Sequence, residues 1–437
     1  MSKIRLFGTS SGYVEIAPAA AASNNTLTAP STVGEIIAKD AAGAIGITSM
    51  KASNVNVGAA VTITESGIEA SGIGITCANI NGSQIGGRRN IIINGAMMVA
   101  QRGISTTTSN AYLLDRFHQE FGGTDEAPTY SQVNVSSGTS PYAEGFRKAL
   151  RITNGNQTSG TQANDYIQLD YRPEAQDIAN SGWNYTSASS FMTLSFWIKS
   201  SVAHNFQLTL RTIDGTSQSF QFRTGTLTAD TWTKVVKKIP GNSNITFDNN
   251  NDKGMYMFLF PYIGTAYTSN SNTLDAWQAS TGTSYGVPDG TTFWTTNDAT
   301  MDITGVQFEF GSQATPFEHH SFGEELELCK RYYQQSYPYG LAYPGQTSYT
   351  NGNEVFHIDD GNIQRYMVRL HKTMRGASST VTIYNPVTGA SDSVRTNDGS
   401  NHNPSGAYDI GNNSFFMDVT PSSGEFVSFH WTANAEV

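Results

Sequence analysis

The side chains best suited to binding chemistry lie in one polar segment, residues 266–298, where aromatic rings alternate with Ser, Thr, Asn and Asp. Sugar binding in water uses flat aromatic faces against C–H patches, while amides and carboxylates hold the hydroxyl groups. We therefore predict glycan contacts from Tyr267, Trp277, Tyr285 and Trp294. The alternative interpretation is that the two tryptophans anchor a long loop to the domain beneath it, because long loops need such anchors.

A second set of candidate contacts lies in the stretch RTNDGSNHNPSGA, residues 395–407, which has no apolar residue before Ala407. This stretch is predicted to be an exposed loop, and a polar loop on a rigid β scaffold is a typical recognition element. Asn401 and His402 are the candidate glycan contacts in it.

Paired carboxylates could support glycoside hydrolysis, which needs one general acid and one nucleophile or base. The candidate acids are Asp289, Asp302, Glu309 and Glu318. They lie beside turn residues, where solvated acids also occur, and nothing distinguishes one pair from another. We therefore predict no catalytic residues and no enzyme, with a polysaccharide depolymerase as the alternative.

The histidine and cysteine pattern predicts neither a metal site nor a cofactor. Adjacent residues of an extended chain point to opposite faces, so His319 and His320 are poorly placed to bind one ion. No H-x-x-x-H or C-x-x-C motif accompanies them. The two cysteines, Cys77 and Cys329, are predicted to be buried and reduced.

Composition argues against several classes of partner. The 437 residues carry a net charge of −10, and the basic clusters Arg88–Arg89 and Lys237–Lys238 are too short for a nucleic-acid surface. No apolar run is long enough to insert into a membrane. The first residues, MSKIRLFGTSSGYVEI, lack the apolar core of a secretory signal, so we expect synthesis in a cytoplasm.

Short apolar–polar alternations, separated by Gly, Asn, Ser and Thr turns, predict an all-β chain. We divide it into an N-terminal β stalk (1–87), a jelly-roll-like β-sandwich body (88–320), a connecting helix (321–336) and a C-terminal β-sandwich tip (337–437). Trp232 is expected to plug the core of the body. Strands are predicted at 88–95, 149–153, 166–171, 192–199, 206–213, 219–224, 233–239, 255–263 and 301–310, and in the tip at 354–358, 365–370, 379–385, 414–419 and 425–432.

The stalk region is rich in small residues and carries isolated isoleucines. Side chains this small bury too little apolar area to stabilise a monomer. We therefore expect the region to share a core with other copies of the chain, most simply as a trimer, with a flexible linker as the alternative. The isoleucines are Ile68, Ile73, Ile75, Ile80 and Ile85.

One helix is predicted, over 324–335. Its first turn carries Glu324 and Glu325 and its last turn carries Lys330 and Arg331, an arrangement that complements the helix dipole. A helix this short must pack on a sheet or on a neighbouring copy.

Several motifs resemble those of tail fibre proteins from short-tailed bacteriophages, notably phages of marine cyanobacteria. The resemblance implies a virion component located in the phage tail, a homotrimer with a carbohydrate-binding-like sandwich. It also implies attachment through the N-terminal region to another tail or adaptor protein, and it supplies no catalytic residues. The motifs are 90–95 (NIIING), 101–103 (QRG), 114–117 (LDRF), 194–199 (LSFWIK), 306–311 (VQFEFG), 314–318 (ATPFE) and 325–334.

The sequence therefore leads us to expect a tail fibre that mediates adsorption to a host, through a glycan on the cell surface. Two alternatives stay open. One is a depolymerase acting on lipopolysaccharide or capsule, and the other is a virion decoration protein without a receptor role.

Overall fold

The computed structural model describes residues 4–7, 12–16, 63–64, 67–68 and 88–436, with gaps at 342–352, 359–362, 377–379, 405 and 421–423. The chain forms two compact units, Met1–Thr76 and Cys77–Val437, so the first boundary lies eleven residues before the predicted one at 87. In the first unit, β1 (Ile4–Phe7) pairs antiparallel with β2 (Tyr13–Ile16), and β3 (Ile63–Thr64) pairs with β4 (Gly67–Ile68). The other isoleucines of the predicted stalk, and Cys77, lie outside the described residues, so the shared core stays a prediction.

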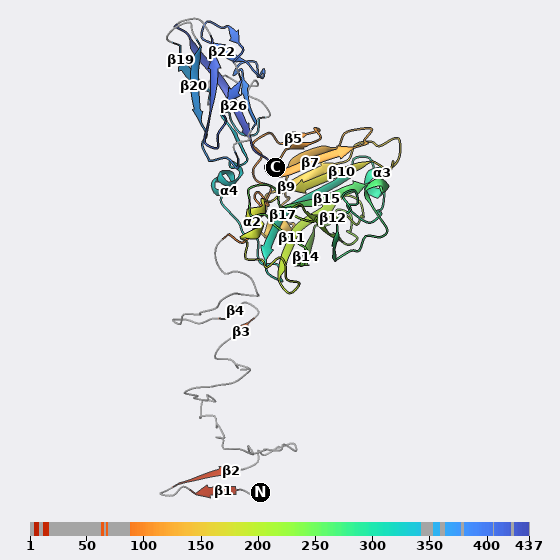
Figure 1. The fold of residues 1–437 in the computed structure, drawn as a ribbon. Helices are drawn as coiled ribbons and strands as arrows, with labels where there is room; N and C mark the ends of the chain where they lie inside the picture. Colours follow the sequence, from red (N-terminus) through yellow and green to blue (C-terminus); the bar gives the residue numbers. More distant parts are fainter. Residues whose placement is uncertain are drawn as a thin grey trace. The chain divides into compact units, whose positions relative to one another are not determined.

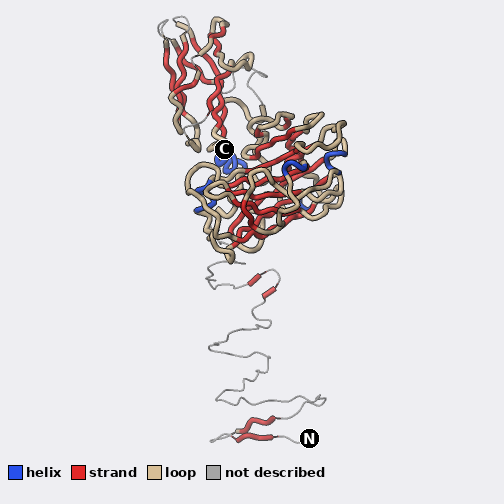
Figure 2. Tube along the Cα trace, turned by 45° about the vertical axis from the view of Figure 1, so that its right-hand side comes forward, coloured by secondary structure: helices blue, strands red, loops and turns tan. Residues whose placement is uncertain are grey.

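The body is a sandwich of two antiparallel sheets (Figures 1 and 2). The seven-stranded sheet has the order β16-β13-β12-β15-β10-β7-β6, and the six-stranded sheet has the order β14-β11-β17-β9-β8-β5. The first sheet comprises β6 (Ala111–Tyr112), β7 (Phe117–Gly122), β10 (Tyr166–Tyr171), β12 (Gln207–Thr212), β13 (Gln218–Arg223), β15 (Met255–Ile263) and β16 (Trp277–Ala279). The second comprises β5 (Ser105–Thr106), β8 (Thr129–Asn134), β9 (Lys148–Thr153), β11 (Phe191–Ser200), β14 (Thr233–Pro240) and β17 (Thr300–Phe310).

The strand connections are those of a jelly roll. From β9 onward the chain passes repeatedly between the sheets, and only the pairs β12–β13 and β15–β16 keep two consecutive strands in one sheet. The result is one set of neighbours β9-β17-β11-β14 facing another, β10-β15-β12-β13. Both the all-β class and the jelly-roll body are therefore confirmed.

The core between the sheets is built by strand alternation. In β11, Leu194, Phe196 and Ile198 enter the main core, while Trp197 faces outward and belongs to a second apolar cluster. The expectation that Trp232 plugs the core is wrong. It precedes β14 and is half-buried against the outward cluster beside Trp197, because that side of the sheet is also covered.

Residues 88–95 do not form the predicted opening strand. The side chain of Asn90 takes the place of a strand partner, since its Nδ2 donates to the Val306 carbonyl at 3.1 Å and its Oδ1 accepts from the N–H of Phe308 at 2.9 Å. The expected Asn-Gly turn is present, with Asn94 at a φ of 62°. The apolar run therefore packs as irregular chain fixed by a buried amide.

Helices are few and short: α1 (Ser140–Ala143), α2 (Ala175–Ala179), the 3₁₀ turn η1 (Thr265–Tyr267), α3 (Thr292–Thr295) and α4 (Phe322–Cys329). Within the described part of the chain, none is both long and apolar enough to cross a bilayer.

The predicted helix over 324–335 is wrong at both ends. It begins earlier, because the Ser321 hydroxyl accepts from the Glu324 N–H at 3.3 Å while the Glu324 carboxylate accepts from the Ser321 N–H at 2.9 Å. It ends at Cys329 because Arg331 forms an ion pair with Glu174 at 2.8 Å and the next residues join a sheet. Tertiary pairing thus overrides helix propensity beyond this point.

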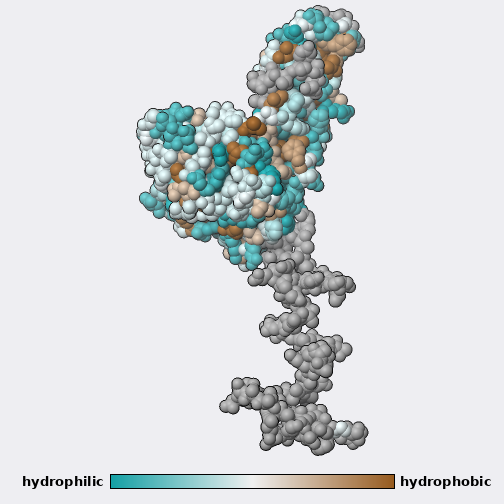
Figure 3. Space-filling view, turned by 180° about the vertical axis from the view of Figure 1, so that it is seen from behind, coloured by the Kyte–Doolittle hydropathy of each residue, from teal (hydrophilic) through white to brown (hydrophobic). Residues whose placement is uncertain are grey.

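The C-terminal region is a second small sandwich, as predicted. The strand β26 (Phe426–Asn434) pairs with β18 (Tyr333–Gln335), β19 (Glu354–His357), β21 (Thr380–Tyr384) and β22 (Val394–Thr396), which in turn pairs with β23 (Asn401–His402). A three-stranded sheet of β20 (Gln364–Arg369), β25 (Ser414–Val419) and β24 (Ala407–Tyr408) faces it across a core around Trp431. Exposed apolar side chains form small separate patches in Figure 3, and those of this sandwich are Val355, Ile363, Met367, Val387 and Phe426.

Candidate functional site

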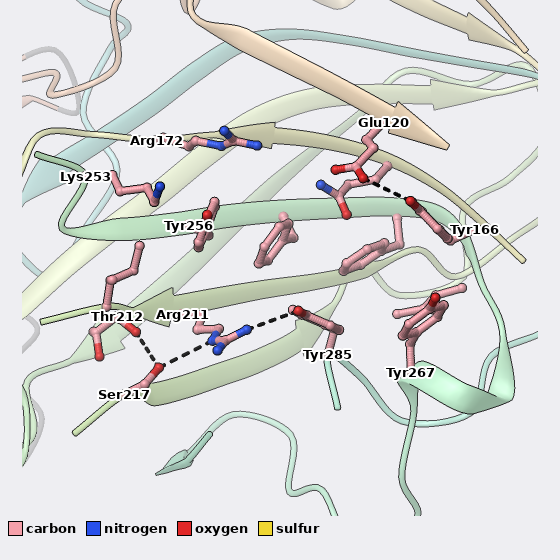
Figure 4. Close-up of a pocket in the computed structure, with 15 residues that line it drawn as sticks. Glu120, Tyr166, Arg172, Arg211, Thr212, Ser217, Lys253, Tyr256, Tyr267 and Tyr285 are labelled. Carbon is pink, nitrogen blue, oxygen red and sulfur yellow. Dashed lines mark hydrogen bonds between the residues drawn. The ribbon is translucent and has the colours of Figure 1, made fainter. Parts of the chain in front are cut away.

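A groove opens on the outer face of the seven-stranded sheet, away from the core between the sheets (Figure 4). Its volume is about 410 Å³, which suits one or two sugar rings. Its lining residues come from β7, β10, β12 and β15, from the residues that flank β10, β12 and β15, and from the loop after β15: Glu120, Tyr166, Gln168, Arg172, Arg211, Thr212, Ile213, Ser217, Lys253, Tyr256, Phe258, Phe260, Ile263, Tyr267 and Tyr285.

Aromatic rings on alternate residues of β15 form the floor. Tyr256 and Phe258 stack with ring centroids 4.9 Å apart and an interplanar angle of 16°, and Phe258 and Phe260 stack at 5.5 Å and 25°. The intervening residues Met257 and Leu259 point into the main core. A strand that is apolar on both faces thus supplies the core with one face and the groove with the other.

The loop after β15 supplies one wall. The ring of Tyr285 stands edge-on to Phe258 with centroids 5.3 Å apart, and Tyr267 packs beside it at 6.4 Å. Hydrogen bonds to its backbone fix this wall, because the Tyr285 N–H donates to the Tyr267 carbonyl at 2.7 Å and the Thr209 hydroxyl of β12 donates to the Tyr285 carbonyl. The wall is therefore held by the sheet on which it lies.

Polar groups occupy both ends of the groove. At one end the Tyr166 hydroxyl donates to Glu120 at 3.0 Å, and burial together with this bond raises the pKa of Tyr166. Toward the other end Arg211 donates to the Tyr285 hydroxyl at 3.1 Å. Arg172 and Lys253 lie over the ring of Tyr256, at 5.1 and 5.6 Å from its centroid. The groove therefore combines an aromatic floor with hydrogen-bonding groups that can reach a polar ligand.

The structure brings two of the predicted contacts together. Tyr267 and Tyr285 line the groove, and their part in glycan contact stays a prediction. Trp294 is only 1% exposed and its indole N–H donates to the Gly160 carbonyl at 2.9 Å, so its ring faces are not open to a ligand. Trp277 lies outside the groove, half-buried, with its N–H donating to the Pro240 carbonyl at 2.6 Å. For Trp294 the anchoring interpretation replaces the predicted contact, whereas for Trp277 both interpretations stay open.

Asn401 and His402 lie elsewhere, in β23 of the C-terminal sandwich. The predicted loop over 395–407 is partly wrong, because residues 395–396 and 401–402 form the hairpin β22–β23 and Ala407 begins β24. The Asn401 side-chain oxygen accepts from Arg395 at 2.9 Å and from Asn385 at 3.0 Å. This oxygen therefore holds the hairpin together, and the glycan contact of Asn401 and His402 stays a prediction.

Sequence reasoning missed most of the groove, including Glu120, Tyr166, Arg211, Tyr256 and Phe258. A signal was present in β15, where MYMFLFPYI is apolar at nearly every position. A strand that is apolar on both faces has a second surface to cover, and such a surface is available for a ligand.

The four candidate acids do not converge on the groove. Asp302 pairs with Arg151 at 2.7 Å and Lys199 at 3.1 Å. Among the lining residues Glu120 is the single carboxylate, and a two-carboxylate mechanism needs a second one facing it. The other three are bonded elsewhere: Glu309 accepts from Thr315, Glu318 accepts from Arg89 and Asn90, and Asp289 lies beside His204 and Arg223.

The histidine pair has structural partners. His319 contacts the Glu144 carbonyl at 2.8 Å and His320 pairs with Glu325 at 2.9 Å. The described residues contain no group of three or more His, Cys, Asp or Glu side chains that could hold a metal ion. Cys329 is fully buried and reduced, as predicted.

No protein-family model and no curated protein matches this chain. Parts of several solved structures are similar to it. One is the enzymatically active domain of tailspike protein 4 from bacteriophage CBA120, at 9% identity over 51% of this chain and 21% of that chain, with a TM-score of 0.27. This chain thus spans about a fifth of that tailspike domain's length.

Two similar structures are carbohydrate-binding modules. The family 11 module from Clostridium thermocellum, in complex with a mixed-linked tetrasaccharide, is 11% identical over 50% of this chain and 99% of its own, with a TM-score of 0.22. A family 30 module is 12% identical over 52% and 93%, with a TM-score of 0.24. At such values the similarity carries no conclusion about ligand or activity.

Proposed function

We propose that this chain is a glycan-binding protein of a phage virion, a homotrimeric tail fibre that adsorbs to a host through a cell-surface glycan held in the groove. The observation that carries the proposal is an aromatic groove with polar groups at both ends, in which Tyr256, Tyr267 and Tyr285 are partly exposed around the buried rings of Phe258 and Phe260. Partly exposed rings of this kind can contact the C–H face of a sugar, while Glu120 and Arg211 can bond its hydroxyl groups.

The tail-fibre part of the proposal is supported by where the resembling motifs lie. Asn90 bonds Val306 and Phe308, so two motifs separated by more than two hundred residues share one buried contact. The Asn94 N–H donates to Glu325, which joins the first motif to the helix motif. The motifs therefore act as one structural unit that joins the body to the helix.

Binding is tested with the whole chain and lipopolysaccharide or capsular polysaccharide from candidate host strains. We expect retardation in affinity electrophoresis without release of oligosaccharide. Tyr256→Ala should weaken binding at least about tenfold, since an aromatic anchor is truncated. Tyr339→Ala is the matched control, because Tyr339 is 43% exposed and lies outside the groove.

Two outcomes would count against the proposal. Equal loss from both tyrosine variants would mean that the groove is not the binding site. Steady release of oligosaccharide would favour the depolymerase alternative. Light scattering of the whole chain tests the trimer, and a mass corresponding to a single chain at micromolar concentration would rule it out.

A further inference from the structure

The charges lining the groove are unevenly distributed. The cations Arg172, Arg211 and Lys253 gather around Tyr256, whereas the single lining carboxylate, Glu120, lies with Tyr166 toward the opposite end (Figure 4). The whole chain carries a net charge of −10, so a group of three cations in one groove runs against the charge of the molecule.

Two of these cations have no anionic partner within the part of the chain that the structure describes. Arg172 is neutralised by Asp170, with Nε 2.6 Å from the carboxylate. Among the described residues, neither Arg211 nor Lys253 forms an ion pair. Arg211 bonds the neutral Tyr285 hydroxyl at 3.1 Å and the Gly282 carbonyl at 3.3 Å.

The surroundings of these two cations favour an anion. Arg211 lies directly opposite Tyr256 in the β12–β15 register, and the Lys253 ammonium is 5.6 Å from the centre of the same ring. Both side chains are half-buried beside apolar rings, where the effective dielectric is lower than in water and charge attraction is stronger. A ligand anion placed here would compensate two positive charges that the protein itself leaves uncompensated.

We propose that the groove selects an acidic saccharide, whose oxyanion lies against Lys253 and Arg211 while its rings lie along Tyr256 and Phe258. The inference rests on the proposed glycan-binding function and narrows its ligand class. A uronate carboxylate, a sulfate ester and a phosphate share the oxyanion chemistry that the two cations recognise.

The test compares acidic polysaccharides with matched neutral ones. Polygalacturonate, alginate and hyaluronan are each run beside their carboxyl-reduced forms, and dextran sulfate and dextran phosphate beside dextran, in affinity electrophoresis with the whole chain. We expect at least one acidic member to bind at least about tenfold more tightly than its neutral counterpart, with the preference shrinking as salt rises. The acidic members that bind distinguish carboxylate from sulfate and from phosphate.

Charge variants then test which residues produce the preference for acidic polysaccharides. Lys253→Gln should reduce it by about fivefold, while Lys148→Gln, which removes the same charge from the six-stranded sheet, should leave it unchanged. Equal reduction by both variants would assign the preference to overall charge and overturn the inference. Equal binding of acidic and neutral partners would overturn it while leaving glycan binding intact. Absence of binding to every member, together with absence of binding to bacterial polysaccharide, would remove the proposed function itself.

Discussion

The outer faces of the two sheets of the sandwich differ in how far the rest of the chain covers them. On the six-stranded sheet the chain covers its own outward side chains, and Trp197 packs there with Phe146 and Ala149. On the seven-stranded sheet the loop that carries Tyr285 packs over Phe258, and Tyr256, Tyr267 and Tyr285 stay partly exposed around the groove. The first face is therefore closed by the chain itself, and the second keeps a groove.

A bulge in β17 makes the closed face possible. The register of β17 against β11 shifts near Gly305, which has a φ of 65°. A Cβ at this position would lie 2.7 Å from the ring of Phe146, so glycine provides both the left-handed backbone and the space for the ring. Phe317 then packs edge-on against Phe146 at 4.8 Å and completes the cover.

Truncating Phe146, which covers the outer face of the six-stranded sheet, should have the largest effect on stability. Phe146→Ala deletes a ring that is 2% exposed, and we expect the free energy of unfolding to fall by about 3–5 kcal/mol. Denaturant unfolding measures the loss. Glycan affinity of the folded variant should stay within a factor of about two, because the groove lies on the other sheet. A large loss of affinity at unchanged stability would contradict the division between the faces.

The C-terminal sandwich offers a second covered face, at His430, which is 2% exposed. Its Nδ1 forms a hydrogen bond with the Ser336 hydroxyl at 3.0 Å, and the Ser336 oxygen accepts from the Trp431 N–H at 2.9 Å. Burial lowers the pKa of His430 from 6.5 to about 4. The folded state therefore holds this imidazole neutral.

Lowering the pH should accordingly reduce the free energy of unfolding through His430. Because the folded pKa lies below the unfolded value, the unfolded chain binds the proton first, and stability present at neutral pH is lost as pH falls from 6.5 toward about 4. The loss should reach up to about 3 kcal/mol. Unfolding free energies of the whole chain and of His430→Gln, compared at several pH values, isolate this contribution. Parallel curves for the two proteins would show that His430 plays no part.

The sequence predicted the strands of the sandwich more accurately than it predicted the site. The apolar runs of β10 and β15 placed both strands at their observed bounds. The helix end was wrong because Arg331 pairs with Glu174 and β18 pairs with β26, and these partners are distant in sequence. Strands β7 and β22 were missed, and β22 is only three residues long.

The site was harder to predict for a related reason. Its residues come from four strands, the residues that flank them and the loop after β15, and only jelly-roll pairing brings Glu120, Arg211 and Tyr256 to one surface. Composition pointed to Tyr267 and Tyr285, which line the groove. It could not separate these residues from Trp294, because an aromatic anchor and an aromatic contact look alike in sequence.

The open face should respond to mutation through binding more than through stability. Tyr285→Ala removes a wall ring and the hydroxyl that Arg211 holds, and we expect affinity for a bound polysaccharide to fall at least about tenfold, which is about 1.4 kcal/mol. Tyr285→Phe keeps the ring and should retain most of the affinity. Titration calorimetry measures both. Equal losses in the two variants would mean that the hydroxyl contributes and the ring does not.

The smallest effect is expected at Trp277, where the two interpretations of the sequence can be separated. Trp277→Phe keeps an aromatic ring against Phe220 but removes the N–H that donates to the Pro240 carbonyl. If Trp277 is an anchor, the substitution should lower the free energy of unfolding by about 1 kcal/mol and leave the affinity unaltered. If Trp277 is a sugar contact, the substitution should lower the affinity and leave the free energy of unfolding unaltered. Parallel unfolding and binding measurements on this variant therefore test whether the glycan-contacting surface includes Trp277.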